Sequence, residues 1–380
     1  MKKKVMIIGS GMMGMMHGDA LLRIPEVELS AIVDPDRSAA KKTAGLLGVE
    51  RVYTDYETAL TTEKPDIVHI CTPNHLHFPI AQFALNNGIG VYCEKPLALT
   101  KEEGEALMRL AEEKRLPNAV NFNYRNNVMV RDIHERILSN DAGSMYFVHG
   151  HYLQDWLMYS TDYSWRLDEE RNGKSRAIAD IGSHWFDTVQ FATGKMIRKI
   201  YCKMNTAIPR RIKPNMEVAT YARNDGNGES ISVKTEDIAM ILLQLEDGTP
   251  GSLILSQVSG GHKNDLQIEI DCANYAMKWE QENADKLYVS SRNTGNQLFY
   301  ASAGTVHGDA VRFAPTPEGH AVAWRDALYN GIREFYQAVD DGSFAKAGRK
   351  SYATFKTGTQ VLSLVEACLQ SNEKNCWVEV

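Results

Sequence analysis

The chain has 380 residues with a formal net charge of −6 at pH 7, and its residues are 43% hydrophobic and 24% charged. Because this length exceeds what one hydrophobic core usually serves, two domains are expected. The acidic balance excludes a typical nucleic-acid partner, and no apolar run approaches the roughly 20 residues that span a bilayer. Composition therefore favours a globular protein with a small-molecule ligand.

Six cysteines are scattered along the chain without a C-x-x-C pair, at positions 71, 93, 202, 272, 368 and 376. No histidines cluster with them to complete a zinc site, so no metal is expected. Two of the cysteines lie in apolar runs typical of strands, which favours buried thiols over disulfides. The sequence thus predicts a cytoplasmic protein.

The opening stretch MIIGSGMMGM, residues 6–15, admits two interpretations. Lysines followed by an apolar run resemble the start of a secretory signal peptide. Gly9, Gly11 and Gly14, however, have the G-x-G-x-x-G spacing that turns a strand into a helix beside a pyrophosphate. His17 and an amphipathic segment follow without a small-residue cleavage site, so the glycine turn is the favoured interpretation.

Short apolar runs alternate with helical patterns as far as residue 124. The expected strands are 4–9, 28–33, 65–73, 89–96 and 117–123. The expected helices are 12–24, 38–47, 79–88 and 101–114. Alternation of this kind implies right-handed crossovers and a doubly wound parallel sheet, so residues 1–124 are predicted to form a Rossmann domain.

Beyond residue 124 the runs become longer and are joined by tight turns, a pattern that predicts an α+β domain with a large, mainly antiparallel open sheet over 125–380. The expected strands are 144–154, 237–246, 251–259 and 265–272. The expected helices are 126–139, 182–193 and 321–340. The polar stretch 224–237 is expected to be a mobile surface loop. The last helix, about 352–371, is not assigned by its periodicity and can pack back on the first domain.

The context of the glycine motif supports a dinucleotide site. Asp34 ends the second expected strand, 20 residues after Gly14, where an acid can accept hydrogen bonds from the adenosine ribose. Its charge would repel a 2′-phosphate and so favours NAD, although Arg37 leaves NADP as the lesser alternative. Met12 and Met13, at the start of the helix, complete this predicted site.

Three further motifs produce a family resemblance: CTPNHLH at 71–77, CEKP at 93–96 and ADIGSHWFD at 179–187. With the glycine turn they follow one another over residues 5–187, and the chain resembles the glucose-fructose oxidoreductase, inositol dehydrogenase and rhizopine-catabolism (Gfo/Idh/MocA) family. The ending WVEV is similar to the tail of that family. The resemblance implies an NAD-dependent dehydrogenase of sugars or cyclitols.

In this family the matching residues flank the nicotinamide ring and the reacting carbon, which implies catalytic roles for Lys95, Asp180 and His184. Hydride transfer from an alcohol requires a base for the hydroxyl proton, and a histidine held by a carboxylate meets that need. His184 oriented by Asp180 is the favoured acceptor, with Lys95 binding and polarising the substrate oxygen. The reverse assignment stays open.

The resemblance also extends the cofactor site, to Thr72, Pro73, Asn74, His77, Glu94, Lys95 and Arg125. Arg125 has a linker salt bridge as an alternative interpretation. The chain departs from the family pattern at Ser175 and Arg176, where many relatives have glycines. This loop is therefore expected to approach the substrate differently.

An aromatic segment at 151–167 is the predicted platform for a sugar ring, because aromatic faces stack on its C–H surfaces. The predicted substrate-binding residues are Gln154, Asp155, Trp156, Tyr163, Trp165 and Arg166, with Lys95, Asp180, His184 and the more distant His320. An aromatic core or a subunit contact is the alternative for any single ring.

The function favoured by these features is oxidation of a secondary hydroxyl on an unphosphorylated sugar, glycoside or cyclitol, with C3 chosen by family analogy. A glycoside-cleaving enzyme that uses transient oxidation and elimination is one alternative, and a non-catalytic dinucleotide sensor is another. An uncovered sheet face in the second domain also predicts a homodimer or homotetramer.

Overall fold

The computed structural model describes residues 2–215, 226–348 and 350–380, and the chain divides into two compact units. The first unit comprises Met1–Asn126 and Arg325–Leu362, and the second comprises Asn127–Trp324 and Ser363–Val380. Neither unit is one continuous piece of chain. Helix α10 (Phe355–Lys374) begins in the first unit and ends in the second.

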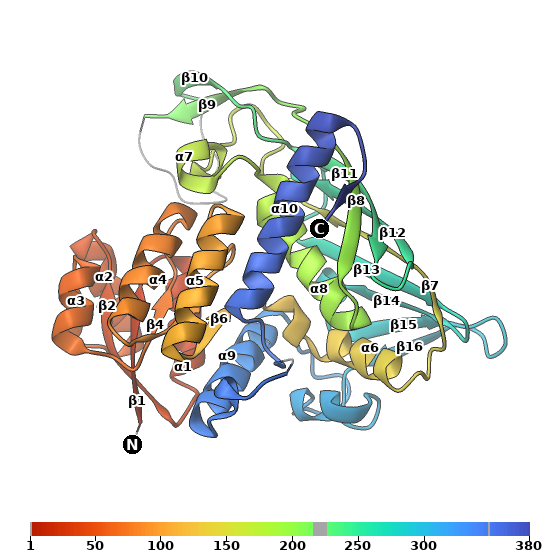
Figure 1. The fold of residues 1–380 in the computed structure, drawn as a ribbon, viewed down its shortest axis with the longest axis horizontal. Helices are drawn as coiled ribbons and strands as arrows, with labels where there is room; N and C mark the ends of the chain where they lie inside the picture. The colour runs from red at the N-terminus through yellow and green to blue at the C-terminus, as the bar shows by residue number, and fades with distance from the viewer. Residues whose placement is uncertain (1, 216–225, 349) are drawn as a thin grey trace. The chain divides into compact units, whose positions relative to one another are not determined.

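A parallel sheet with helices around it forms the centre of the first unit (Figure 1). It has six strands in the order β3-β2-β1-β4-β5-β6. Its strands are β1 (Lys3–Ile8), β2 (Val27–Val33), β3 (Arg51–Tyr53), β4 (Ile67–Ile70), β5 (Gly90–Cys93) and β6 (Asn118–Val120). Its helices are α1 (Met12–Leu21), α2 (Arg37–Leu47), α3 (Tyr56–Glu63), α4 (His77–Asn86), α5 (Lys101–Lys114) and α9 (Trp324–Asp340). This strand order is that of a doubly wound dinucleotide-binding sheet, and the predicted fold class is confirmed.

Local chemistry explains where the helices of the first unit begin. The side chains of Asp36, Asp55 and Thr100 accept hydrogen bonds from the first-turn N–H groups of α2, α3 and α5. Strands β4 and β5 are buried at every position, as expected of a parallel sheet covered on both faces. Phe355, at the start of α10, belongs to the same hydrophobic core.

The second unit contains a nine-stranded sheet in the order β16-β15-β14-β13-β7-β12-β11-β8-β17. Its strands are β7 (Met145–Leu153), β8 (Ile197–Asn205), β11 (Ile238–Leu245), β12 (Pro250–Ser256), β13 (Asp265–Cys272), β14 (Ala276–Glu280), β15 (Lys286–Ser290), β16 (Gln297–Tyr300) and β17 (Val378–Glu379). Only β7 and β12 run parallel; the other neighbours in the described sheet are antiparallel. The expected mainly antiparallel sheet is therefore confirmed.

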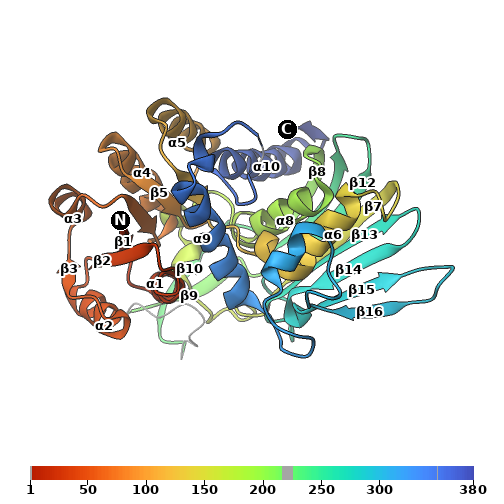
Figure 2. The same ribbon diagram turned by 90° about the horizontal axis from the view of Figure 1, so that it is seen from below.

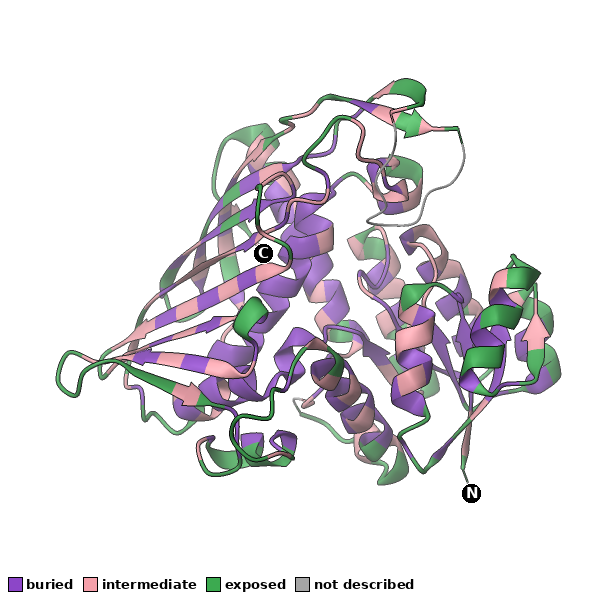
Figure 3. Cartoon of the chain, turned by 180° about the vertical axis from the view of Figure 1, so that it is seen from behind, coloured by how far each residue is buried: buried purple, intermediate pink, exposed green. Residues whose placement is uncertain are grey.

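Helices cover one face of this sheet (Figure 2). The covering helices are α6 (Val128–Leu138) and α8 (Ser183–Thr193). The unit also contains a short helix, α7 (Glu169–Asn172), which does not belong to this layer. Residues therefore alternate along the strands: in β13, Leu266, Ile268 and Ile270 are buried while their neighbours are half-buried. Figure 3 shows this alternation as bands of different colour along the strands of the large sheet. None of the described helices is long and apolar enough to cross a membrane.

The expected mobile loop at 224–237 is wrong over most of its length. Residues 228–232 form strand β10 (Gly228–Ser232), which pairs antiparallel with β9 (Arg210–Pro214). Glu236 and Asp237 are fully buried, because two arginines and several main-chain N–H groups surround them. Asn224 and Asp225 lie outside the described residues.

Candidate active site

The glycine turn between β1 and α1 has the geometry that a pyrophosphate requires. Gly9 has φ +100°, and a Cβ atom on Gly14 would lie 1.9 Å from the Gly9 carbonyl oxygen. A Cβ atom on Gly11, in contrast, would meet nothing within 4 Å. There is thus no space for a side chain at Gly9 or Gly14, whereas the space beside Gly11 is free of protein atoms. Helix α1 begins directly after Gly11 without a side-chain cap, so its first N–H groups can bind a pyrophosphate.

Asp34 is held in place beside this turn. Its Oδ2 atom accepts hydrogen bonds from the main-chain N–H of Ser10 at 2.8 Å and from the Ser10 hydroxyl at 2.7 Å. Its Oδ1 atom accepts one from the N–H of Asp36 at 3.0 Å, while Arg37 is exposed at the start of α2. A fixed carboxylate beside an open glycine turn fits NAD, because it can accept hydrogen bonds from the ribose and would repel a 2′-phosphate.

The loop after β4 is tied to the loop after β5 by His77. The ring is fully buried, with Nδ1 2.7 Å from the Pro96 carbonyl oxygen and Nε2 2.9 Å from that of Thr72. Burial lowers the pKa of His77. Both ring nitrogens therefore face the main chain, and His77 can shape the predicted cofactor site through the positions of these two loops.

The other expected cofactor residues have varied exposure. Asn74 and Arg125 are buried, Thr72, Pro73 and Met13 are half-buried, and Met12 is exposed. Asn74 lies in a 3-10 turn (Asn74–Leu76), and Arg125 lies in another (Tyr124–Asn126).

Glu94 and Lys95 follow β5, at the carboxyl edge of the parallel sheet. The Oε1 atom of Glu94 accepts hydrogen bonds from Asn121 at 2.6 Å and from His17 at 2.9 Å, and its Oε2 atom accepts the N–H of Lys95 at 3.2 Å. Burial acts to raise the pKa of Glu94, but the hydrogen bonds from His17 and Asn121 outweigh it and hold the pKa below its ordinary value. Glu94 is thus a buried carboxylate, and Lys95 is half-buried beside it.

In the second unit, Asp180 lies on a π turn (Ile178–Gly182) that runs directly into α8, and His184 lies in the first turn of α8. Single π turns inside helices are frequent at functional sites. The Oδ2 atom of Asp180 accepts a hydrogen bond from Gln257 at 2.9 Å, and its Oδ1 atom lies 3.4 Å from Nε of Arg166. His184 is buried, with its ring centre 6.4 Å from that of Tyr152.

The two partners of Asp180 each keep one polar atom without a hydrogen bond. Nη1 of Arg166 and Oε1 of Gln257 are both buried and lack a partner among the described residues. Buried polar groups are almost always hydrogen-bonded, so such atoms require an explanation. A ligand hydroxyl could accept a hydrogen bond from the arginine or donate one to the amide oxygen.

Arg176, which stands where many relatives have glycine, is turned inward. Its guanidinium is fully buried and pairs with Asp237, which also binds Arg211 at 2.8 Å. The Oε1 atom of Glu236 accepts the N–H groups of Arg176 and Ile178 at 3.0 and 2.8 Å. These contacts fix the start of the π turn that carries Asp180.

The aromatic segment divides between core and surface. Trp156 and Tyr163 pack on a small core of Leu157, Leu167 and Val233, so for these two rings the alternative interpretation as core has structural support. The guanidinium of Arg166 lies 4.6 Å from the ring centre of Trp165. Gln154, which is buried, accepts the indole N–H of Trp156 at 2.8 Å.

Asp155 and His320, both predicted to bind substrate, make contacts with other protein groups that do not support this role. Asp155 pairs with Lys263 at 2.5 Å and accepts the N–H of Gly261 at 3.1 Å; the hydrogen bond from Lys263 lowers its pKa. His320 is exposed on a loop, with Nδ1 3.2 Å from the Pro317 carbonyl oxygen.

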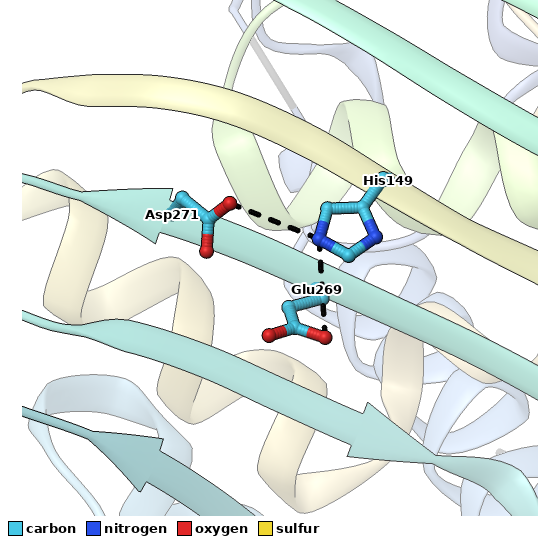
Figure 4. A group of neighbouring side chains, drawn as sticks. All are labelled: His149, Glu269 and Asp271. Atoms are coloured by element: carbon cyan, nitrogen blue, oxygen red, sulfur yellow. Dashed lines mark ion pairs between the residues drawn. The ribbon is translucent and has the colours of Figure 1, made fainter.

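One group of three possible metal ligands occurs among the described residues, although the sequence predicts none. His149 on β7 lies between Glu269 and Asp271 on β13, with Nε2 at 3.9 and 3.7 Å from their carboxylate oxygens (Figure 4). All three side chains are half-buried. Acidic groups at a protein surface are common without an ion, so these three side chains do not by themselves indicate a metal site.

Sequence reasoning missed several residues that hold the site. Ser10, Asn121 and Gln257 each fix a predicted carboxylate, yet only Ser10 lies within a recognised motif. His17 lies three residues after Gly14, outside the glycine motif, and no recognised motif includes it. Gln257 is 77 residues from Asp180, so no local pattern could connect them.

The glycine turn, the fixed Asp34 and the doubly wound strand order define an NAD-binding domain of the Rossmann class. Residues 3–122 match the family model described as "Oxidoreductase family, NAD-binding Rossmann fold", and residues 130–277 match that of the GFO/IDH/MocA C-terminal domain. The chain belongs to the Gfo/Idh/MocA family of NAD-dependent oxidoreductases.

Relatives of known name include carbohydrate dehydrogenases. Levoglucosan dehydrogenase from Pseudarthrobacter phenanthrenivorans is 26% identical over 389 residues, covering 98% of this chain and 97% of the relative. D-glucoside 3-dehydrogenase from Escherichia coli is 27% identical over 197 residues, covering 50% of this chain and 54% of the relative. A solved levoglucosan dehydrogenase complex with NADH and L-sorbose matches with a TM-score of 0.90 at 26% identity, covering 100% of this chain and 99% of that one.

Proposed function

We propose that this protein oxidises a secondary hydroxyl of an unphosphorylated sugar, glycoside or cyclitol. The observation that carries the proposal is the Asp180 group, in which Arg166 and Gln257 each keep a buried polar atom without a protein partner. A neutral hydroxyl matches one donor and one acceptor, whereas a phosphate would require several cations. Arg166 is already paired with Asp180, which argues against a phosphorylated substrate.

The proposed catalytic residues are Lys95, Asp180 and His184. His184 accepts the hydroxyl proton, Asp180 supports it from the preceding turn, and Lys95 binds and polarises the substrate oxygen. Bound NAD supplies the hydride acceptor, held by the glycine turn and Asp34. Family resemblance supports these roles, and so do the buried position of His184 and the fixed carboxylate of Asp180.

The proposed position of oxidation is one equivalent to C3. The likeness to a D-glucoside 3-dehydrogenase supports this position, and the likeness to levoglucosan dehydrogenase supports an unphosphorylated ring as substrate. Trp165, stacked by Arg166, is the ring best suited to contact the C–H face of the sugar.

A substrate panel tests the proposal. Purified protein is incubated with NAD and, separately, levoglucosan, monosaccharides, glycosides, inositols, sugar phosphates and 2-hydroxy acids; turnover is followed by NADH absorbance, and the product ketone is located by NMR. Unphosphorylated rings should be preferred, and Lys95→Ala and His184→Ala should each remove turnover by orders of magnitude while NADH binding survives. Preference for a phosphate or a linear acid would refute the substrate class. Aglycone release without net NADH would indicate glycoside cleavage instead.

We also infer a homo-oligomer built on the uncovered face of the nine-stranded sheet. Met240, Leu242 and Ile254 are 51%, 50% and 44% exposed, and Met240 stands opposite Ile254 on the neighbouring strand. Such an apolar strip favours burial against a second copy. Light scattering should show a dimer or tetramer that Ile254→Lys dissociates, whereas Leu46→Lys, at an exposed position on α2, should not.

A further inference from the structure

A buried chain of hydrogen bonds runs through the first unit and ends at the residue before Lys95. Its members are Tyr336 on α9, His69 on β4, His17 on α1 and Glu94 after β5. Tyr336 and His69 are joined at 2.9 Å, the two histidines at 2.8 Å, and His17 and Glu94 at 2.9 Å. All four residues are less than 9% exposed.

The direction of these hydrogen bonds follows from their chemistry. Glu94 is a carboxylate and only accepts, so Nε2 of His17 donates to it. Burial, with a smaller contribution from the neighbouring His17, lowers the pKa of His69 well below its ordinary value, so the ring of His69 is neutral. Because a neutral imidazole donates from one nitrogen and accepts at the other, His69 donates one of its two hydrogen bonds, to His17 or to Tyr336, and accepts the other.

A second set of contacts holds the other side of Glu94. The hydroxyl of Tyr92 donates to Oδ1 of Asn121 at 3.1 Å, which orients the Asn121 amide to donate to Glu94 at 2.6 Å. Tyr92 is itself stacked on His69, with ring centres 4.7 Å apart and 8° between the planes. The orientation of Glu94 is thus fixed by donors from α1 and from the end of β6.

The fixed carboxylate of Glu94 interacts with Lys95 in two ways. Its Oε2 atom accepts the main-chain N–H of Lys95 at 3.2 Å, and the charge of Lys95 contributes to the lowered pKa of Glu94. Apolar side chains would fill the same volume at least as stably as a buried set of two histidines and a carboxylate. The presence of two buried histidines and a buried carboxylate is explained if these groups position Lys95, which follows Glu94 in the chain.

We propose that His17 is a positioning residue for Lys95 and acts through Glu94. The inference rests on the proposed catalytic role of Lys95. His17 holds the Glu94 carboxylate, Glu94 holds the main chain and charge of Lys95, and His69 with Tyr336 fixes the ring of His17. Displacement of a catalytic group by about 1 Å can reduce the rate about 100-fold, so the chain acts on turnover without touching the substrate.

Matched variants test the inference, with turnover measured on the panel sugar that the parent protein oxidises fastest. His17→Leu removes the donor to Glu94, whereas His17→Gln keeps an N–H donor at that position. His17→Leu should lower kcat by about 10- to 100-fold with KM and the NADH dissociation constant within about threefold of the parent. His17→Gln should restore most of kcat.

The pH profile separates positioning from a merely structural role. The titratable groups around Glu94 are His17, Cys71, His77, Tyr92, Cys93 and Lys95. The pKa values of both cysteines and Tyr92 are raised and that of His77 is lowered, mainly by burial, so burial favours the neutral form of each of these four groups. Loss of the His17 donor should therefore move the acidic limb of kcat to higher pH, because Glu94 then takes up a proton more readily.

The outcomes distinguish this inference from the proposed function. Turnover retained by Lys95→Ala would refute the catalytic assignment on which both depend. If Lys95→Ala loses turnover but folded His17→Leu keeps the kcat and the pH profile of the parent, the catalytic role of Lys95 stands and the positioning role of His17 is overturned. If His17→Leu does not fold, Glu94→Gln carries the test, since it keeps the side-chain shape and removes the charge: a kcat equal to that of the parent would overturn the inference.

Discussion

Gly14 packs so closely on Gly9 that a Cβ atom at position 14 would lie 1.9 Å from the Gly9 carbonyl oxygen, whereas one at Gly11 would meet no protein atom within 4 Å. Gly14→Ala must therefore shift main chain, and we expect it to lower the melting temperature by several degrees and to abolish NADH binding. Gly11→Ala should leave the melting temperature unchanged and weaken NADH binding at least about tenfold, because the new methyl group occupies the space for the pyrophosphate. Melting curves and NADH fluorescence titration measure both effects, and equal melting temperatures for the two variants would contradict this account.

Asp34 should set the cofactor preference. Removing its carboxylate in Asp34→Ala loses charge-assisted hydrogen bonds to the ribose, which corresponds to at least about tenfold weaker NADH binding. NADPH binding should weaken less, because the repulsion of its 2′-phosphate disappears. Ser10→Ala, which removes one of the hydrogen bonds that hold Asp34, should have a smaller effect in the same direction. A variant that still binds NADH as the parent does would assign the ribose to another residue.

Asp237 should be more important for stability than either arginine that it binds. Asp237→Asn leaves Arg176 and Arg211 buried without a carboxylate between them, and we expect a loss of about 3–5 kcal/mol in the free energy of unfolding. Arg176→Met should cost less, because Arg211 still pairs with Asp237. Urea unfolding provides the measurement, with Asp309→Asn as the control: this change breaks an exposed ion pair to Arg312 and should cost less than about 1 kcal/mol.

Stability should decrease as the pH falls below about 6.5. Burial lowers the pKa values of His69 and His77 from 6.5, so between that value and the folded pKa the unfolded chain binds more protons than the folded one. Each residue contributes a slope of up to about 1.4 kcal/mol per pH unit, with stability lost as the pH decreases. Urea midpoints measured from pH 7.5 to pH 5 test the slope, and His69→Phe should make it shallower. A midpoint that is constant over this range would show that these histidines are not held neutral.

The parts of the fold that could be predicted are those with local signals. Helix α5 was expected at 101–114 and spans Lys101–Lys114, because Thr100 caps its start and a regular apolar face follows. Strand β10 was missed, since its sequence GESIS lies in a polar, glycine-rich stretch typical of a loop. The burial of Asp237 depends on Arg176 and Arg211, which are 61 and 26 residues away along the chain.

The candidate site shows the same division. Asp34 was found because its spacing from the glycine motif is fixed by the strand-helix-strand unit. The partners of Asp180 could not be found in this way, since Gln257 comes from the loop after β12, a separate element of the second unit. Sequence motifs thus identified the candidate groups, but only folding shows what orients them.

The first unit is built from two separate segments of the chain, and this constrains the order in which the chain can fold. Phe355, Val361 and Leu362 belong to the core around the parallel sheet, and Tyr336 completes the hydrogen bonds of His69. During synthesis on a ribosome, all six parallel strands emerge long before these residues are made. The strands of the nucleotide-binding unit are therefore synthesised first, but its hydrophobic core can be completed only after almost the whole chain has been synthesised.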